Sequence, residues 1–240
     1  MGDFFSFLLD YSFLFVILAI IITLIAQVRV HTTFQKASRI PTQNGMSGRE
    51  AAELVLAQNG VRGVHITRSA GGHLSDHYDP RSDEIRLSAE VYDGRTAAAV
   101  GVAAHEAGHA VQAAKGYAFF KVRMAIIPVT NYMSRAVFPL FLMGLLFDML
   151  LLTQLGSVFL YLAIFAFSFS VIFQLVTLPC EYNASRRALR AVEASGYFSP
   201  NDYNGARRVL SAAALTYVAA LFTSLVYLLR YIAIANARRR

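Results

Sequence analysis

Hydrophobic residues are concentrated in four blocks of the chain, which are separated by sections rich in charged and polar residues. The first block, 11–28, carries no charge, and two more cover 136–152 and 158–178 on either side of the short sequence TQLGS. About 20 apolar residues cross the hydrocarbon core of a bilayer, so these blocks predict membrane-spanning helices, the last two forming a hairpin. A fourth block, 209–229, is rich in Ala, Ser and Thr, and either crosses the membrane or lies within the bundle without fully crossing.

The first block also resembles the apolar core of a signal peptide, and this alternative is disfavoured by the residues around it. Asp3 and Asp10 stand where a signal peptide has basic residues, and the following AQVRVH is not a small-residue cleavage site. We therefore expect a retained anchor.

A shorter, nearly apolar helix is predicted around the sequence VGVAAHEAGHAVQ in the polar middle section. Its period places His105 and His109 one turn apart on one face, with Glu106 beside the first. Burying these three polar groups without a partner would cost several kcal/mol. The pattern H-E-x-x-H is typical of zinc peptidases, in which both imidazoles bind Zn²⁺ and the glutamate takes a proton from water.

Composition and charge place the chain in a membrane. It is 56% hydrophobic, with a mean hydropathy of +0.46, which is too apolar for an ordinary soluble domain. Lys and Arg gather in 29–123 and 186–208, so the positive-inside rule predicts that both sections are cytoplasmic and the N-terminus is outside. The net charge of +7 then reflects topology, with some affinity for anionic lipid, and predicts no nucleic-acid partner. If the fourth block crosses the membrane, the basic C-terminal sequence NARRR lies outside, which disagrees with the positive-inside rule.

A zinc site of this class needs a third protein ligand, and the predicted hairpin returns the chain to the same side of the membrane. Glu181, at the end of the third block, is the expected ligand. The adjacent Cys180 points about 100° away on a helix and is not expected to bind the same ion. As the only cysteine it excludes an internal disulfide and fits a cytoplasmic face. His31, His65 and His73 have no ligand spacing to any other residue, so we expect them at surface or turn positions.

The middle section predicts a helix over SGREAAELVLAQNG, with a capping box from Ser47 to Glu50, and then short strands. Asp93 or Thr96 can cap the zinc helix. A free edge strand, either 74–79 or 84–88, would pair with substrate backbone.

Two side chains of this strand region are candidates for catalysis. His77 or Tyr78 is a candidate donor to the oxyanion. The alternative is that the polar residues of 76–79 only cap the hairpin turn.

Four segments of the sequence resemble the bacterial membrane-bound neutral zinc metallopeptidase family: AAHEAGHAVQ, LSDHYDP, QLVTLPCEYNASRRAL and SAAALTYVAA. They occur in order and span most of the chain. The resemblance implies a membrane-embedded peptidase whose zinc ligands are His105, His109 and Glu181, with Glu106 as the catalytic base. It does not imply a particular substrate.

A looser similarity concerns the HtpX and CAAX-protease group of membrane peptidases. There, the glutamate ligand opens an E-x-x-A-D pattern, whose aspartate steadies a zinc-binding histidine. This chain has Ser185 at the aspartate position. Either Ser185 or Asn183 is therefore expected to accept a hydrogen bond from an imidazole.

The predicted fold is a mainly α membrane protein of about four transmembrane helices, with a small α+β zincin-like catalytic domain on the cytoplasmic side. The predicted organisation is an N-terminal transmembrane anchor (1–28), a cytoplasmic catalytic section (29–135), a transmembrane hairpin (136–180), a cytoplasmic segment with the third ligand (181–208), and a C-terminal membrane helix with a basic tail (209–240).

The predicted function is that of a gluzincin-like zinc metalloendopeptidase of the bacterial inner membrane, acting on peptide or membrane-protein substrates at the cytoplasmic face. Zinc would lower the pKa of a bound water to about 7, and Glu106 would carry its proton to the leaving amine. The oligomeric state is not predicted.

Two alternatives to this function are kept. In the first, the zinc helix lies in the bilayer, as in site-2-type proteases, although the apolar run 97–104 is too short to span. In the second, the protein is a non-catalytic scaffold that holds zinc for folding, which would require a fourth protein ligand.

Overall fold

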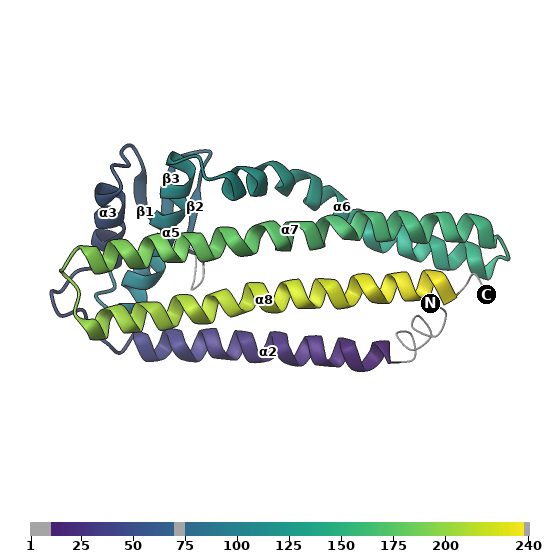
Figure 1. The fold of residues 1–240 in the computed structure, drawn as a ribbon, viewed down its shortest axis with the longest axis horizontal. Helices are drawn as coiled ribbons and strands as arrows, with labels where there is room; N and C mark the ends of the chain where they lie inside the picture. Colours follow the sequence, from purple (N-terminus) through teal and green to yellow (C-terminus); the bar gives the residue numbers. More distant parts are fainter. Residues whose placement is uncertain (1–10, 70–74, 238–240) are drawn as a thin grey trace. The chain divides into compact units, whose positions relative to one another are not determined.

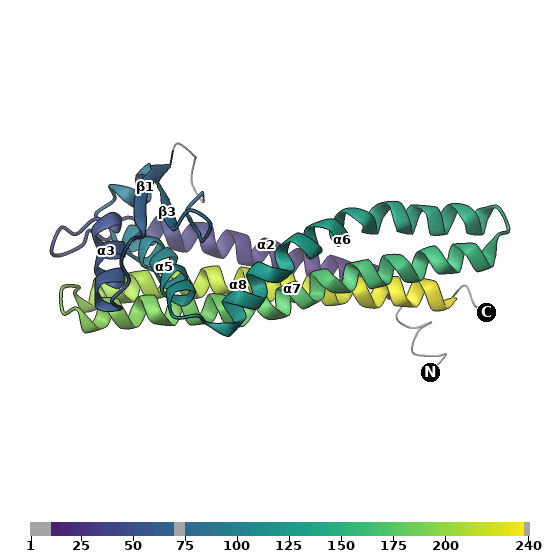
Figure 2. The same ribbon diagram turned by 90° about the horizontal axis from the view of Figure 1, so that it is seen from above.

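The computed structural model describes residues 11–69 and 75–237, which form a mostly helical protein with one three-stranded sheet (Figures 1 and 2). In this part of the chain, four helices are long and apolar enough to cross a membrane. The predicted mainly α architecture with about four spans is therefore confirmed. These helices are α2 (Ser12–Ala37), α6 (Ala118–Met149), α7 (Thr153–Ala194) and α8 (Pro200–Ala237).

The connection between α6 and α7 differs from the predicted one. The sequence TQLGS was expected to separate the two spans, but it is helical, and the turn falls at 150–152, where Leu151 has a φ of 62°. Gly156 serves close helix packing, because a Cβ there would lie 2.9 Å from the carbonyl oxygen of Gly144. Figures 1 and 2 both show α6 and α7 side by side near this turn.

The helices also extend beyond the predicted apolar blocks. α6 begins at Ala118 instead of Ala136, and α7 continues through Pro179 to Ala194. The added residues of α7 are rich in Ala, Arg and Glu, which favour helix without forming a continuous apolar run. As a consequence, Glu181 stands within a continuous helix.

The chain divides into two compact units, one formed by 1–25, 122–177 and 217–240, the other by Ala26–Lys121 and Leu178–Thr216. The second, called the catalytic unit below, contains the sheet, the shorter helices and the predicted site. Its remaining elements are α3 (Gly48–Gln58), β1 (His65–Ser69), β2 (His77–Asp79), β3 (Glu84–Ser88), α4 (Ala89–Tyr92) and α5 (Ala97–Ala114).

The sheet has the order β1-β3-β2, with β1 parallel and β2 antiparallel to β3. The prediction of Glu84–Ser88 as a free edge is wrong, because His65–Ser69 pairs with its second side. β2 is an edge strand, which agrees with the other predicted choice, 74–79; its first residue, Leu74, lies outside the described residues.

Capping hydrogen bonds define where α3 and α5 begin. The predicted capping box is present, since Ser47 accepts a hydrogen bond from the backbone of Glu50, whose side chain accepts one from the Ser47 backbone. Thr96 caps α5 through a bond from Ala99 N. The other candidate cap, Asp93, ends α4 and forms an ion pair with Arg68.

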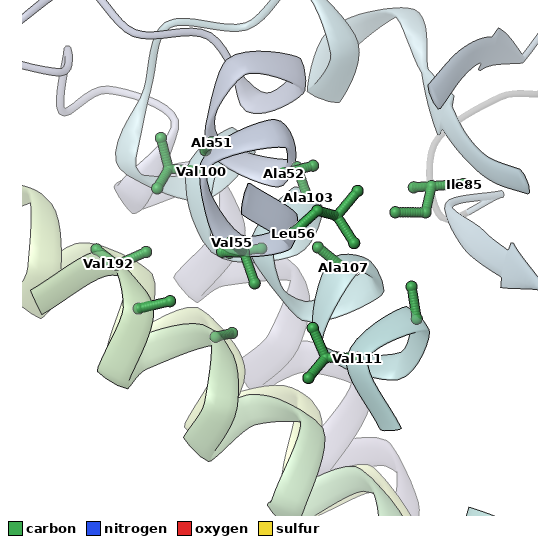
Figure 3. Packing of buried hydrophobic residues seen from close by; sticks show 14 of the residues in the cluster. Ala51, Ala52, Val55, Leu56, Ile85, Val100, Ala103, Ala107, Val111 and Val192 are labelled. Carbon is green, nitrogen blue, oxygen red and sulfur yellow. The ribbon is translucent and has the colours of Figure 1, made fainter. Parts of the chain in front are cut away.

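The α5 helix is buried against α3, the sheet and the ends of α7 and α8 that belong to the catalytic unit. Figure 3 shows Val100, Ala103, Ala107 and Val111 of α5 in one cluster with residues of α3, β3 and α7. Small residues allow close approach: a Cβ on Gly108 would lie 2.5 Å from the carbonyl oxygen of Ala184. Close packing at this point holds the histidine helix against the helix that carries Glu181.

The substitution Gly108→Ala should therefore separate α5 from α7. Overpacking of this kind costs about 1–3 kcal/mol, and it should also weaken zinc binding. Ala114→Val, at the exposed end of the same helix, is the control and should change stability by less than about 0.5 kcal/mol. Thermal unfolding in detergent, followed by circular dichroism, measures both variants. Equal unfolding temperatures would contradict the packing account.

Candidate metal centre

Three side chains meet in the interior of the catalytic unit. His105 and His109 come from one face of α5, and Glu181 comes from α7. The Oε2 atom of Glu181 lies 3.1 Å from Nε2 of His105 and 3.5 Å from Nε2 of His109. Glu181 is 1% exposed, whereas the side chain of His105 keeps 13% of its surface exposed. The group is thus largely buried, and His105 is its most exposed member.

Each imidazole is oriented by a second hydrogen bond. Nδ1 of His105 lies 3.1 Å from Oγ of Ser185, and Nδ1 of His109 lies 3.0 Å from Oε1 of Gln112. In the tautomer that binds metal, Nδ1–H donates to these oxygens and the Nε2 lone pair points to the ion. The structure thus places Ser185 where the sequence predicted an acceptor.

Gln112 was missed in the sequence. It is fully buried, and its Nε2 donates to the carbonyl of Cys180 at 2.7 Å and to Oδ1 of Asn183 at 3.0 Å. These bonds turn its oxygen toward His109. The signal was available, because Gln112 is a polar residue in an apolar helix and lies three positions after His109, on the same face.

Asn183 does not bond to an imidazole within the described residues, contrary to one of the two predicted choices. Its Oδ1 accepts from Gln112 and from Nε of Arg187 at 2.7 Å. Asn183 therefore acts one hydrogen bond further from the site. Cys180 is buried and donates its S–H to Oε1 of Gln112, so it also belongs to the support of His109.

Glu106 lies beside the three-residue group and is also buried. Its Oε2 accepts a hydrogen bond of 3.0 Å from the backbone N–H of Tyr78, in the edge strand β2. Burial raises the pKa of Glu106, and the neighbouring histidines partly oppose this effect. The carboxylate therefore connects the strand edge to the histidine helix.

The two predicted oxyanion donors have other partners. The hydroxyl of Tyr78 donates to Asp83 at 2.8 Å, and Nδ1–H of the exposed His77 donates to the carbonyl of Ser75 at 2.7 Å. In the same segment, Asp79 accepts from the backbone of Arg81. These bonds agree with the alternative in which polar residues stabilise the hairpin.

Two of the other histidines, His31 and His65, are not part of the three-residue group. His31 is exposed and bonds to Gln35, and His65 is exposed at the start of β1. His73 lies outside the described residues.

The donor set fits a zinc ion. The ligand atoms lie within 4.8 Å of one another, and ligands of tetrahedral zinc are about 3.3 Å apart for bonds of about 2.05 Å. The electrostatics also favour a cation. Burial lowers the pKa of His109, but hydrogen bonds with Cys180 and Glu181 and the charge of Glu181 outweigh it and raise that pKa to about 10. Among the described residues, the group contains three ligands, which suits an open site.

Four candidate spans, together with a buried group of two histidines and one glutamate that could hold a metal ion, are features of a membrane metalloprotein. The chain belongs to the family described as "Putative neutral zinc metallopeptidase", which it matches over residues 12–236. It is also similar to "Putative membrane protease YugP" of Bacillus subtilis (strain 168), with 44% identity over 209 residues, which cover 87% of this chain and 89% of that relative. No solved structure matches the chain. The family resemblance predicted from the sequence is confirmed.

The substitution Gln112→Leu tests the support of His109. Loss of such an outer hydrogen bond typically weakens metal binding by about 10–100-fold, and Gln112→Glu, which keeps an acceptor for Nδ1–H, should lose less. Gln58→Leu, on the exposed end of α3, is the control. Zinc competition against a chelator gives the affinities, and wild-type affinity in a folded Gln112→Leu protein would refute this role.

Proposed function

We propose that the chain is a zinc metalloendopeptidase of the bacterial inner membrane, in which His105, His109 and Glu181 hold the ion and Glu106 is the catalytic base. The observation that carries the proposal is the position of Glu106, between the three-residue group and the N–H of Tyr78 on an edge strand. Zinc, when bound, lowers the pKa of a coordinated water to about 7 and polarises the substrate carbonyl.

The protein's own contribution is the handling of the proton. Glu106 accepts it from the attacking water and delivers it to the nitrogen of the leaving amine. The bond from Tyr78 N–H holds Oε2 of Glu106 in place, so Oε1 is the oxygen that exchanges the proton.

Substrate binding is assigned to β2. An extended peptide adds to a free sheet edge through main-chain hydrogen bonds, and β2 is the edge from which Glu106 receives its bond. The arrangement of an edge strand above a histidine helix supports the zincin-like description of the catalytic unit. His77 and Tyr78 as oxyanion donors stay a prediction, which requires each side chain to leave its present partner.

The catalytic face is proposed to be cytoplasmic, because most Lys and Arg residues fall in the sections that carry the site. Substrates would then be peptides or membrane-protein segments at the inner surface.

The alternative with the zinc helix in the bilayer is disfavoured, since α5 is absent from the candidate spans of the described residues and packs against α3. The scaffold alternative does not explain a buried glutamate beside the ligands.

Three substitutions test the assignment of roles. Glu106→Gln should retain zinc and lose casein cleavage, whereas His105→Ala and Glu181→Ala should lose zinc and activity together. Glu53→Gln, an exposed position on α3, is the control and should behave as wild type. Metal content and cleavage are measured on the same preparations in detergent. An active Glu106→Gln protein would refute the proposed base.

Labelling of introduced cysteines tests the orientation. Ser82→Cys, in the exposed hairpin turn, should react with an impermeant maleimide only after cells are permeabilised, because the catalytic unit is proposed to be cytoplasmic. Leu151→Cys, in the α6–α7 turn and 87% exposed in the wild type, should react in intact cells. The native Cys180 is buried and serves as the unlabelled background. Labelling of Ser82→Cys in intact cells would contradict the orientation.

A further inference from the structure

A second site of the catalytic unit lies between α7 and α8. It is a pocket of about 490 Å³ that no step of peptide hydrolysis uses. Three of its lining residues are arginines: Arg186 and Arg190 from α7 and Arg207 from α8. Within residues 11–69 and 75–237, these three guanidinium groups have neither an ion pair nor a hydrogen bond in the protein. The single carboxylate among the lining residues is that of Glu193, so the pocket has an excess of positive charge.

Arginines arranged in this way favour an oxyanion with several acceptor atoms. Each guanidinium presents a planar set of N–H donors that matches phosphate or carboxylate geometry. The arginines project from two helices into one pocket, so a single anion can bond to more than one of them. Hydroxyl groups of Tyr182, Tyr203 and Ser211, which also line the pocket, add further donors.

The apolar part of the lining indicates which oxyanion. Leu210 and Ala214 belong to the apolar block 209–229 of α8, and Tyr182 follows the apolar block 158–178 of α7 by four positions. The pocket therefore adjoins the ends of two candidate membrane spans. Arg and Tyr at such ends are typical of the lipid headgroup level. A free phosphate ion would use the arginines but gain nothing from the adjoining apolar blocks.

We propose that this pocket binds the phosphate headgroup of an anionic phospholipid. The phosphate lies against Arg186, Arg190 and Arg207, and the start of the acyl chains lies along the exposed Leu215, which follows the pocket residue Ser211 by about one helical turn. Each basic residue at an anionic lipid surface increases the binding constant about fivefold. Here three arginines act on one phosphate group.

The bound headgroup would lie beside the metal centre. Ser185 lines the pocket and its Oγ is also the partner of His105 Nδ1. One side chain therefore separates the lipid site from a predicted zinc ligand. If the proposed peptidase function is correct, this proximity holds the active site at the membrane surface, but lipid binding itself does not depend on that function.

The test compares lipid binding by the intact protein and three variants in detergent. Short-chain phosphatidylglycerol, phosphatidylcholine and inorganic phosphate are titrated separately, and bound lipid is counted by native mass spectrometry. The pocket variant replaces Arg186, Arg190 and Arg207 by Gln. The matched control replaces Arg62, Arg81 and Arg208 by Gln, which removes the same charge from exposed positions outside the pocket. Ser211→Phe fills the pocket and keeps its charge.

Wild type and the matched control should bind phosphatidylglycerol equally. The pocket variant should bind it at least about fivefold more weakly, and Ser211→Phe should also lose affinity. The proposal is overturned if the pocket variant binds as wild type, if the matched control loses as much, or if phosphatidylcholine binds as tightly. Displacement of the lipid by an equal concentration of inorganic phosphate would identify a free-phosphate site instead. Casein cleavage is not part of the readout, so failure of the proposed peptidase function would leave this result intact.

Discussion

The buried carboxylate of Glu181 is the constraint on which the catalytic unit depends. An isolated ionised carboxylate in a protein interior is strongly unfavourable unless a cation or several donors compensate it. Here the compensating groups are the Nε2 atoms of His105 and His109, both within 3.5 Å of one carboxylate oxygen. Two neutral imidazoles and a carboxylate balance a divalent ion better than they balance one another. The placement of these three side chains by α5 and α7 agrees with the zinc peptidase family to which the chain belongs.

Packing and hydrogen bonding bring these three ligands to one point. Gly108 allows the backbone of α7 to approach α5 closely, and Gln112 joins the two helices by bonding to His109, Cys180 and Asn183. A displacement of either helix would break several of these bonds together. Rigid outer support of this kind fixes the orientation of metal ligands and reduces the reorganisation needed during catalysis. The peptide-binding role proposed for β2 depends on the same framework, because Tyr78 connects that strand to Glu106.

Features that depend on hydrophobic patterning or on a short sequence motif were predictable from the sequence. The four apolar blocks predicted the four candidate spans, and H-E-x-x-H predicted which residues of α5 face Glu181. Features set by packing were not predictable in the same way. Gly156 was interpreted as part of a turn because a sequence does not reveal the close approach of Gly144. The parallel pairing of β1 with β3 is non-local, so the central position of Glu84–Ser88 could not be deduced from its residues. Gln112 was identifiable by spacing, but its two further bonds come from α7, which is distant in sequence.

X-ray absorption at the zinc edge tests the central claim, that one ion is held by His105, His109 and Glu181, most directly. The predicted first shell of the wild type contains two imidazole nitrogens and oxygen ligands, with zinc–ligand distances of about 2.0–2.2 Å and no sulfur. In a Glu181→Gln protein reconstituted with excess zinc, the imidazole signal should persist while the oxygen contribution changes and affinity falls. A sulfur ligand at about 2.3 Å, which would identify Cys180, or a first shell that is the same in both proteins, would contradict the proposed metal centre.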